Sequence, residues 1–575
     1  FDAVLKDLEP DKAHGVDGWR NEHLRVLVVS HGNSEETYDH DVPHLLLLVG
    51  LDHLNTRLPT WHYHLFAATP LLTLYKDMEQ SAVRPAVIPS RLLCAWKGTA
   101  WAQYKPRLLS IIEPFNLGAS KNGPSQLTTG ITLLKQINDL AVSNGHEGKM
   151  FFFLDIVNAH SNISAEKVSQ ALLKHVPQLH RHFLLNALIP KIAVAVKGPE
   201  VHDLGFTIDE GLLQGMAGSS QEFMLTFHAI LTWLSKKIQT LEGDRFPNSV
   251  DSIVRAGADD LTVVCRPETF AALYPDLVTR LSEMNLQLNT KPDKSASFSH
   301  ASDRSTPPFT AITESCGIHP GRVAIKPPNA PEYWAFGAKV FGVPIGDDAA
   351  IQQLALDKLN SFLAKHETVS KILASPHRPA NAHQFLLAIT TKCQQCMLEY
   401  LQRGVPPRLL DAINLADSVD TALLTNVAKA SDFPLDRLLA ARDPAGNASA
   451  AAYASDGIAA LFLSRIRMKL SDQGLGIRSH AELQDVRFTS GVITTLASLC
   501  SHEVCTRKES TDAAGKTTPA IYATLPGSFD VPSMQRAIGT HFGERNSEVR
   551  PLDTFFNSGL VLAHDLRRTV DHLQT

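Results

Sequence analysis

The pattern of apolar and polar positions predicts buried strands at two places, and each strand delivers acidic residues to its end. The first run is Met150-Phe-Phe-Phe-Leu154, which Asp155 follows directly. The second extends from Ile253 to Cys265 and is interrupted by Asp259-Asp260, as a hairpin turn would be. Short apolar runs of this kind are typical of buried strands. A buried carboxylate costs several kcal/mol unless it is paired or holds a metal.

Three carboxylates brought together in this way would form a site for two divalent cations. Such a pair of ions activates the attacking oxygen and stabilises the leaving oxygen of an in-line phosphoryl transfer. A simpler interpretation of the same residues is also open. In it Asp155 caps the helix that follows, and Asp259-Asp260 form an ordinary turn.

The surrounding pattern predicts further elements of both kinds. Helical periodicity and capping residues predict helices over residues 125–142, from Ser164 onward, for about twenty residues after a glycine-rich segment at 205–220, over 270–284, and over most of 347–433. Short β-type runs are predicted at 92–97, 104–113, 286–289 and 339–346. A polar loop is predicted at 506–519, with a short helical tail after it.

Two of these β-type runs have a cation at the edge, Lys97 in the first and Arg107 in the second. If the runs form a β-ribbon, the two cations would face each other across it and could hold a nucleotide triphosphate. Solvated charges at a sheet edge that discourage aggregation are the alternative.

Composition narrows the class of protein. The chain has 575 residues, of which 44% are hydrophobic and 20% are charged, as in an ordinary globular protein. No apolar run reaches the length of about 18 residues that spans a bilayer, so no membrane partner is expected. Seven scattered cysteines indicate a reducing, intracellular compartment. The net charge of −5 argues mildly against strong nucleic-acid binding, but it leaves room for a local basic groove.

The order of these segments resembles that of the reverse transcriptases of non-LTR retrotransposons. Several segments are similar to that family's motifs in the family's order: Lys12-Ala-His-Gly15-Val-Asp17-Gly18-Trp19, Lys97 and Arg107, Phe153-Leu-Asp155-Ile-Val-Asn-Ala-His160, Gln214-Gly215, Ala258-Asp259-Asp260, Leu288-Asn289 with Lys294, Val340 to Gly346, and Gly474 to Arg478. The resemblance implies an α+β right-hand polymerase fold. Fingers would run over 1–150, a palm with an antiparallel sheet over 151–348, a helical thumb over 349–440, and a helical C-terminal extension over 441–575.

The resemblance also implies an activity, that of an RNA-directed DNA polymerase with a two-metal mechanism. Two Mg²⁺ ions would be held by Asp155, Asp259, the backbone carbonyl of Ile156 and, more loosely, Asp260. The residues implied to lie along the nucleotide and template are Lys97, Arg107, His160, Gln214, Gly215 and Lys294. The implied partner is RNA or an RNA–DNA duplex.

Several positions depart from the family's pattern. His160 and Gly257 each stand where the family has an aromatic residue, and the family's prolines after Gln214-Gly215 are absent. Arg107 is followed by Leu108 rather than proline. These departures and the acidic net charge favour a different hypothesis, a domesticated and inactive reverse-transcriptase fold that serves as a structural subunit of a ribonucleoprotein. A maturase-like splicing factor is a third interpretation, and the compartment stays open between nucleus and mitochondrion.

Overall fold

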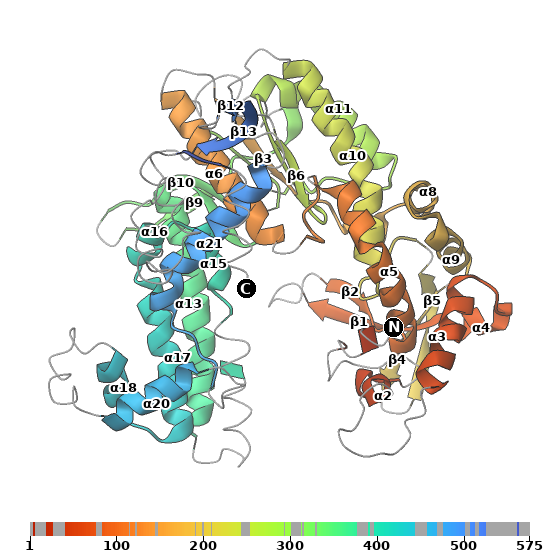
Figure 1. The fold of residues 1–575 in the computed structure, drawn as a ribbon, viewed down its shortest axis with the longest axis horizontal. Helices are drawn as coiled ribbons and strands as arrows, with labels where there is room; N and C mark the ends of the chain where they lie inside the picture. The colour runs from red at the N-terminus through yellow and green to blue at the C-terminus, as the bar shows by residue number, and fades with distance from the viewer. Residues whose placement is uncertain are drawn as a thin grey trace.

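A computed structural model describes most residues between Trp19 and Thr524, a few positions before Trp19, and Leu560–Leu562. Its longer gaps are residues 27–40, 76–82, 144–147, 243–252, 301–311, 376–388, 391–395, 443–456, 469–474, 501–505 and 512–516. The predicted turn that begins at Lys12 lies outside the described residues, apart from Trp19. The described elements are mostly helices around small sheets, so the predicted α+β class is confirmed (Figure 1).

The two acidic strands predicted from the sequence lie in the same four-stranded antiparallel sheet. Its strand order is β6 (Ile253–Gly257), β7 (Asp260–Cys265), β3 (Met150–Leu154) and β8 (Ala296–Phe298). β3 pairs antiparallel with β7 on one side and with β8 on the other. Every residue of β3 is buried, which explains why the strand is a continuous apolar run rather than an alternating one.

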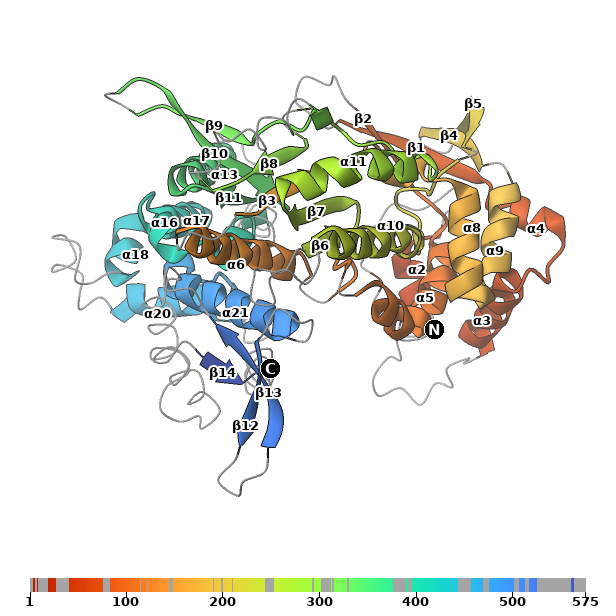
Figure 2. The same ribbon diagram turned by 90° about the horizontal axis from the view of Figure 1, so that it is seen from above.

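Side chains of β3 alternate between two separate cores, one on each face of the sheet. Phe152 and Leu154 belong to a large core that also includes residues of α10 (Ser219–Glu242) and α11 (Pro267–Ser282). Phe151 and Phe153 belong to a smaller core on the other face. This core also includes residues of helix α6 (Gly123–Ser143), of the hairpin of β10 (Tyr333–Val340) and β11 (Val343–Gly346), and of β7 and β8 (Figure 2). The sheet is therefore covered on both faces, and its end is left for the carboxylates.

Residues Arg91–Ile112 form one helix, α5, so the β-type runs predicted at 92–97 and 104–113 are wrong. The side chain of Ser90 caps the helix by accepting a hydrogen bond from the amide of Leu93. The buried positions recur at three- and four-residue spacing, which is the helical period: Leu92, Leu93, Ala95, Trp96, Ala100, Trp101, Leu108 and Ile112. Pro106, which the sequence analysis placed inside a β-type run, lies inside this helix.

A second four-stranded sheet lies in the N-terminal part of the protein. Its order is β2 (Val83–Val87), β1 (Ala68–Tyr75), β4 (Lys191–Lys197) and β5 (Glu200–Ile208), so it joins strands from before and after β3. Nearby helices are α2 (Asn21–Val26), α3 (Asp41–Leu54), α4 (Thr60–His64), α8 (Ala165–His175) and α9 (Pro177–Leu188). The predicted cap of α8 is confirmed, because Ser164 accepts a hydrogen bond from the amide of Lys167.

The C-terminal part is built of helices around a core of its own. After the three-stranded sheet of β9 (Arg322–Ile325), β10 and β11 come α13 (Asp348–Leu373), α15 (Glu399–Gly404), α16 (Pro407–Asp411), α17 (Leu415–Ser431), α18 (Leu435–Arg442), α20 (Gly457–Arg467) and α21 (His480–Cys500). The carboxylate of Asp420 on α17 accepts hydrogen bonds from the Ser479 hydroxyl and the His480 amide, which fixes the start of α21. Figure 1 shows these helices on one side of the molecule and the N-terminal helices on the other, with the central sheet between them.

The expected helical extension at the C-terminus is wrong where the structure describes residues beyond Cys500, while the predicted helical tail lies outside the described residues. The described residues there form strands β12 (Thr506–Thr511), β13 (Thr517–Thr524) and β14 (Leu560–Leu562), which pair antiparallel. The first two strands are rich in threonine, whose β-branched side chain favours strands, although the stretch had been interpreted as a polar loop. Among the described helices, none combines the length and apolar character needed to cross a bilayer.

Candidate active site

The register of the central sheet brings the three predicted carboxylates to one place. β3 pairs with β7 through Leu154 opposite Leu261. The same register, continued by one position, puts Asp155 opposite Asp260. The Cα atoms of such antiparallel partners lie about 4.5–5.5 Å apart. Asp259 lies in the turn between β6 and β7, immediately before Asp260. The three aspartates therefore lie at the same end of the sheet.

The electrostatics of Asp260 reflect this crowding. Its pKa is raised from 3.8 to about 7. Burial is the largest cause, and the negative charges of Asp259 and Asp155 add to it, while the positive charge of Lys294 acts in the opposite direction. The end of the sheet thus gathers negative charge in partly buried surroundings, and Lys294, which was predicted to lie near phosphates, is close enough to influence it.

Asp155 is held in place by residues that follow α11. The side-chain amide of Asn289 donates a hydrogen bond of 2.8 Å to Oδ2 of Asp155. The backbone amide of Asp155 donates a hydrogen bond of 3.1 Å to the hydroxyl of Ser295. The backbone carbonyl of Asp155 accepts a hydrogen bond of 2.9 Å from the backbone amide of Asn289. Sequence reasoning placed Asn289 in a motif but gave neither residue a role, because both contacts join segments that are far apart in the chain.

The carbonyl of Ile156, which was predicted to be a metal ligand, takes no part in the pairing of its own segment. Ile156 forms an isolated antiparallel bridge with Leu288. The two hydrogen bonds of this bridge join the Asn289 amide to the Asp155 carbonyl and the Val157 amide to the carbonyl of residue 287. They therefore leave the carbonyl of Ile156 outside the pairing.

The donor atoms at this end of the sheet have the chemistry that Mg²⁺ prefers, namely carboxylate and carbonyl oxygens. Within the described ranges, no three His, Cys, Asp or Glu side chains converge on one point as the ligands of a bound ion do. The raised pKa of Asp260 supports the fit, since a cation beside it would favour the ionised carboxylate. Asp155, Asp259, Asp260 and the carbonyl of Ile156 are the residues that would hold such an ion.

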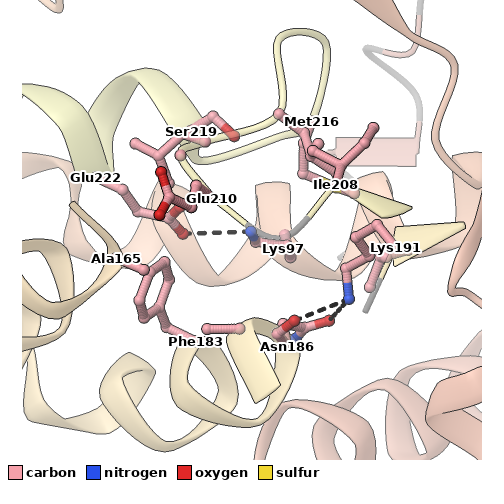
Figure 3. Close-up of a pocket in the computed structure, with 15 residues that line it drawn as sticks. Lys97, Ala165, Phe183, Asn186, Lys191, Ile208, Glu210, Met216, Ser219 and Glu222 are labelled. Atoms are coloured by element: carbon pink, nitrogen blue, oxygen red, sulfur yellow. Dashed lines mark hydrogen bonds and ion pairs between the residues drawn. The ribbon is translucent and has the colours of Figure 1, made fainter. Parts of the chain in front are cut away.

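Lys97 faces a cavity that is bounded by α5, α9, β4, β5 and the turn before α10, as Figure 3 shows. The cavity has a volume of about 70 Å³. Nζ of Lys97 lies 3.2 Å from a carboxylate oxygen of Glu222, and the two side chains are 12% and 5% exposed. Lys97 is therefore paired with a buried carboxylate of the protein itself, a partner that no local sequence signal indicated.

Lys191 lines the same cavity and was also missed by sequence reasoning. Its Nζ donates hydrogen bonds to the carbonyl oxygens of Asn186 at 3.0 Å and Ile189 at 3.3 Å (Figure 3 shows the contacts with Asn186). Burial lowers the pKa of Lys191 to about 8, and the positive charge of Lys97 contributes. Lys97, Lys191 and Glu222 thus line one cavity, in which the two positive charges act on each other and Lys97 is paired with the carboxylate.

Arg107 lies ten positions beyond Lys97 on the same helix, about 15 Å farther along its axis. The side chain is exposed, and its charge contributes to lowering the pKa of His175 on α8. The β-ribbon arrangement of Lys97 and Arg107 is therefore wrong. Contact of either residue with a nucleotide stays a prediction.

His160 is packed against the start of α10. It lies on the short helix α7 (Ala159–Asn162), and its ring stacks on buried Phe223 with a centroid distance of 4.6 Å. The carbonyl of His160 accepts a hydrogen bond of 2.6 Å from the amide of Leu212. The imidazole is thus part of the packing between the segment that follows Asp155 and the helix that follows the glycine-rich turn.

Backbone contacts hold the glycine-rich turn, although the family's prolines are missing. The carbonyl of Gln214 accepts a hydrogen bond of 2.9 Å from the amide of Val87 at the end of β2. Gly215 has a φ of 106°, and a Cβ at this position would lie 2.5 Å from the Val87 carbonyl oxygen. A side chain at Gly215 would therefore displace the turn from β2.

Comparison with known proteins assigns the chain to no family. The chain matches no protein-family model and no curated protein. The resemblance to reverse transcriptases accordingly depends on the motifs in the sequence and on the positions of the residues described above.

Proposed function

We propose that this chain is a reverse transcriptase, an RNA-directed DNA polymerase with a right-hand fold. The observation that carries the proposal is the position of Asp155 opposite Asp260, with Asp259 in the adjoining turn, at the end of a four-stranded antiparallel sheet. In this assignment the sheet and its helices are the palm. The N-terminal elements are the fingers, and the helices of residues 349–440 are the thumb, on opposite sides of the palm (Figure 1).

The carboxylates would hold two Mg²⁺ ions, with the carbonyl of Ile156 as a further ligand. Ions bound there activate the attacking oxygen and stabilise the leaving oxygen of a phosphoryl transfer. Asn289 orients Asp155 through its 2.8 Å hydrogen bond, and Lys294 offers a cation to the phosphates of the incoming nucleotide. Each role belongs to a residue that the described structure brings to the same end of the sheet.

A basic groove supports a nucleic-acid partner despite the net charge of −5. The groove lies along α8 and α10 and has a volume of about 540 Å³. Its lining includes no acidic residue, and its charged or titratable members are Lys174, His175, His228, Lys236 and Lys237. Arg107 lies close enough to act on the pKa of His175. Cations grouped in this way give sequence-independent affinity for the phosphates of RNA or an RNA–DNA duplex.

The experiment that tests this function is primer extension on an RNA template with Mg²⁺ or Mn²⁺. The wild-type protein is expected to extend the primer, and the double variant Asp259→Ala, Asp260→Ala is expected to extend none. Asp357→Ala is the matched control, because Asp357 is an exposed aspartate of α13 that accepts a hydrogen bond from Gln353, away from the sheet end and from the basic groove. Equal extension by the double variant, or no extension by the wild type with either ion, would contradict the proposal.

A second candidate function is that of an inactive structural subunit of a ribonucleoprotein. The observation that favours it is the buried pair of Lys97 and Glu222, because a cation engaged by the protein is less available to a triphosphate. The stacking of His160 on Phe223 points in the same direction. In that case neither the wild type nor the double variant extends a primer, and both assemble equally well with their native protein and RNA partners.

A further inference from the structure

The turn that carries Asp259 contains a residue in an uncommon backbone conformation. Gly257 pairs with Asp260 across the hairpin, so Ala258 and Asp259 form a two-residue turn. Ala258 has a φ of 61°. This left-handed region is costly for a residue that carries a Cβ. Contacts from outside the hairpin are therefore needed to hold the turn, and the structure provides two of them.

The first contact comes from Asn116, at the edge of the sheet. The Asn116 side chain is fully buried. Its amide nitrogen donates to the carbonyl of Ala258 at 2.9 Å, and its oxygen accepts from the amide of the same residue at 3.1 Å. Next to it, the Leu117 amide donates to the carbonyl of Ala256 at 2.8 Å. Both backbone groups of the strained residue are thus satisfied by one side chain that is anchored on β6.

The second contact comes from Phe341, on one face of the sheet. Phe341 and Gly342 form the turn between β10 and β11, with φ values of 50° and 80°. The Phe341 ring covers Gly257 so closely that a Cβ built on Gly257 would lie 1.9 Å from the tip of the ring. Because Gly257 and Asp260 are opposite residues, their side-chain directions share a face. The ring therefore occupies the side-chain position beside Asp260.

We propose that Asn116 and Phe341 are positioning residues that together fix the Asp259–Asp260 turn relative to Asp155. Asn116 holds the backbone of Ala258 by two hydrogen bonds at the edge of the sheet, and the Phe341 ring packs on Gly257 at the face of the sheet. This inference rests on the proposed function, because it assigns the two residues to the metal site of that function.

Phe341 also connects these two positioning residues, called the clamp below, to the C-terminal helices. Val343 at the start of β11 belongs to the core of the C-terminal helices, so the β10–β11 hairpin is packed on that unit. Phe341 itself is packed against the core beneath the central sheet. A displacement of the C-terminal helices would therefore move the Phe341 ring, and with it the turn that carries Asp259 and Asp260.

The test compares three readouts in Asn116→Ala and Phe341→Ala. They are the Mn²⁺ dissociation constant, kcat and KM of primer extension, and hydrogen exchange at the amides of residues 258–261. Residues that orient metal ligands from outside the coordination shell change metal affinity by roughly 10- to 100-fold. We expect the Mn²⁺ dissociation constant to rise by that order and kcat to fall, with KM for the template–primer unchanged. Hydrogen exchange in the turn is expected to increase in both variants.

Each variant has a matched control. Asn138→Ala removes a similarly buried asparagine that bonds both backbone groups of Lys149, at the other end of β3. Phe336→Ala truncates a ring of the same core that lies on β10, outside the turn. Both controls are expected to lower the unfolding temperature while Mn²⁺ affinity and exchange in the turn stay as in the wild type.

A swap variant separates positioning from general packing. In Gly257→Phe, Phe341→Ala a ring delivered from position 257 enters the space that the Phe341 ring has left. We expect it to recover Mn²⁺ affinity and kcat relative to Phe341→Ala, whereas Gly257→Phe alone is expected to lose both. A swap that restores the unfolding temperature but not Mn²⁺ affinity would overturn the positioning role of Phe341.

The outcomes also distinguish this inference from the proposed function. If hydrogen exchange and Mn²⁺ affinity in the two variants match the wild type, the clamp is refuted even though primer extension occurs. If the wild-type protein neither binds Mn²⁺ nor extends a primer while exchange in the turn rises as expected, the clamp on the turn stands. The assignment of a metal site, and with it the proposed function, then fails.

Discussion

Replacing Lys97 with methionine is expected to destabilise the protein through the carboxylate that is left behind. Nζ of Lys97 lies 3.2 Å from Glu222. At this distance and an effective dielectric constant of about 20, the attraction between two unit charges is about 5 kcal/mol. Both side chains are largely buried, so solvent screens the pair weakly. Breaking a buried pair by removing one partner costs about 3–5 kcal/mol, because the remaining charge is uncompensated.

The assay is a double-mutant cycle of the free energy of unfolding, measured by urea denaturation. Lys97→Met and Glu222→Leu are each expected to lose about 3–5 kcal/mol, while the double variant loses far less because no charge is left unpaired. Lys326→Met is the control, since its pair with Glu332 is exposed and worth less than about 1 kcal/mol.

Primer extension by the same variants decides what Lys97 does. If its role is to neutralise Glu222, the double variant recovers activity along with stability. The reasoning is refuted if Lys97→Met unfolds at the same urea concentration as the wild type. It is also refuted if the double variant is stable but still fails to extend, because Lys97 would then act on the substrate directly.

Three further predictions follow from other parts of the structure. The pKa of Asp260 is about 7 in the fold and 3.8 as its ordinary value, so the folded state binds more protons between these values. Without metal, the free energy of unfolding should therefore fall as the pH rises from about 4 to 7, and Asp260→Asn should flatten that part of the profile. Wild-type urea titrations that give the same free energy of unfolding at about pH 4 and about pH 7 would contradict this. Lys174→Glu with Lys236→Glu should weaken the binding of single-stranded RNA and reduce the slope of log K against log salt concentration by about 0.7 for each phosphate that is no longer neutralised. Unchanged filter-binding curves would remove the basic groove as a nucleic-acid surface. Gly257→Ala should lower the free energy of unfolding by about 1–3 kcal/mol, because its Cβ would lie 1.9 Å from the Phe341 ring. A calorimetric unfolding temperature equal to that of the wild type would contradict this, because the ring would then move aside without cost.

The parts of the site that could be predicted from the sequence are those with a local signal. The continuous apolar run before Asp155 requires a strand buried on both faces, and the acidic pair at 259–260 interrupts a second run at the spacing of a hairpin. Ser164 predicted the start of a helix for an equally local reason, since its hydroxyl caps the amide of Lys167. In each case the residues that decide the structure are neighbours in the chain.

The parts that could not be predicted depend on contacts between distant segments. Glu222 neutralises Lys97 from another helix, and Asn116 bonds a residue that is 142 positions away in the chain. The departure at Gly257 suggested a missing ring, but the ring is supplied by Phe341 from a different hairpin. Helix α5 was misinterpreted because its apolar pattern was divided at residues 98–103 into two pieces that are too short to show a helical period.

The most direct test of the central claim is a crystal structure of the wild-type protein with Mn²⁺, measured at the manganese absorption edge. The account predicts anomalous density at the end of the central sheet, with Asp155, Asp260 and the carbonyl of Ile156 at about 2.1 Å, a distance close to that of Mg²⁺. Asp259 should supply a further oxygen. Anomalous density confined to other parts of the protein, or none in crystals that contain millimolar Mn²⁺, would contradict the assignment of these carboxylates as a metal site.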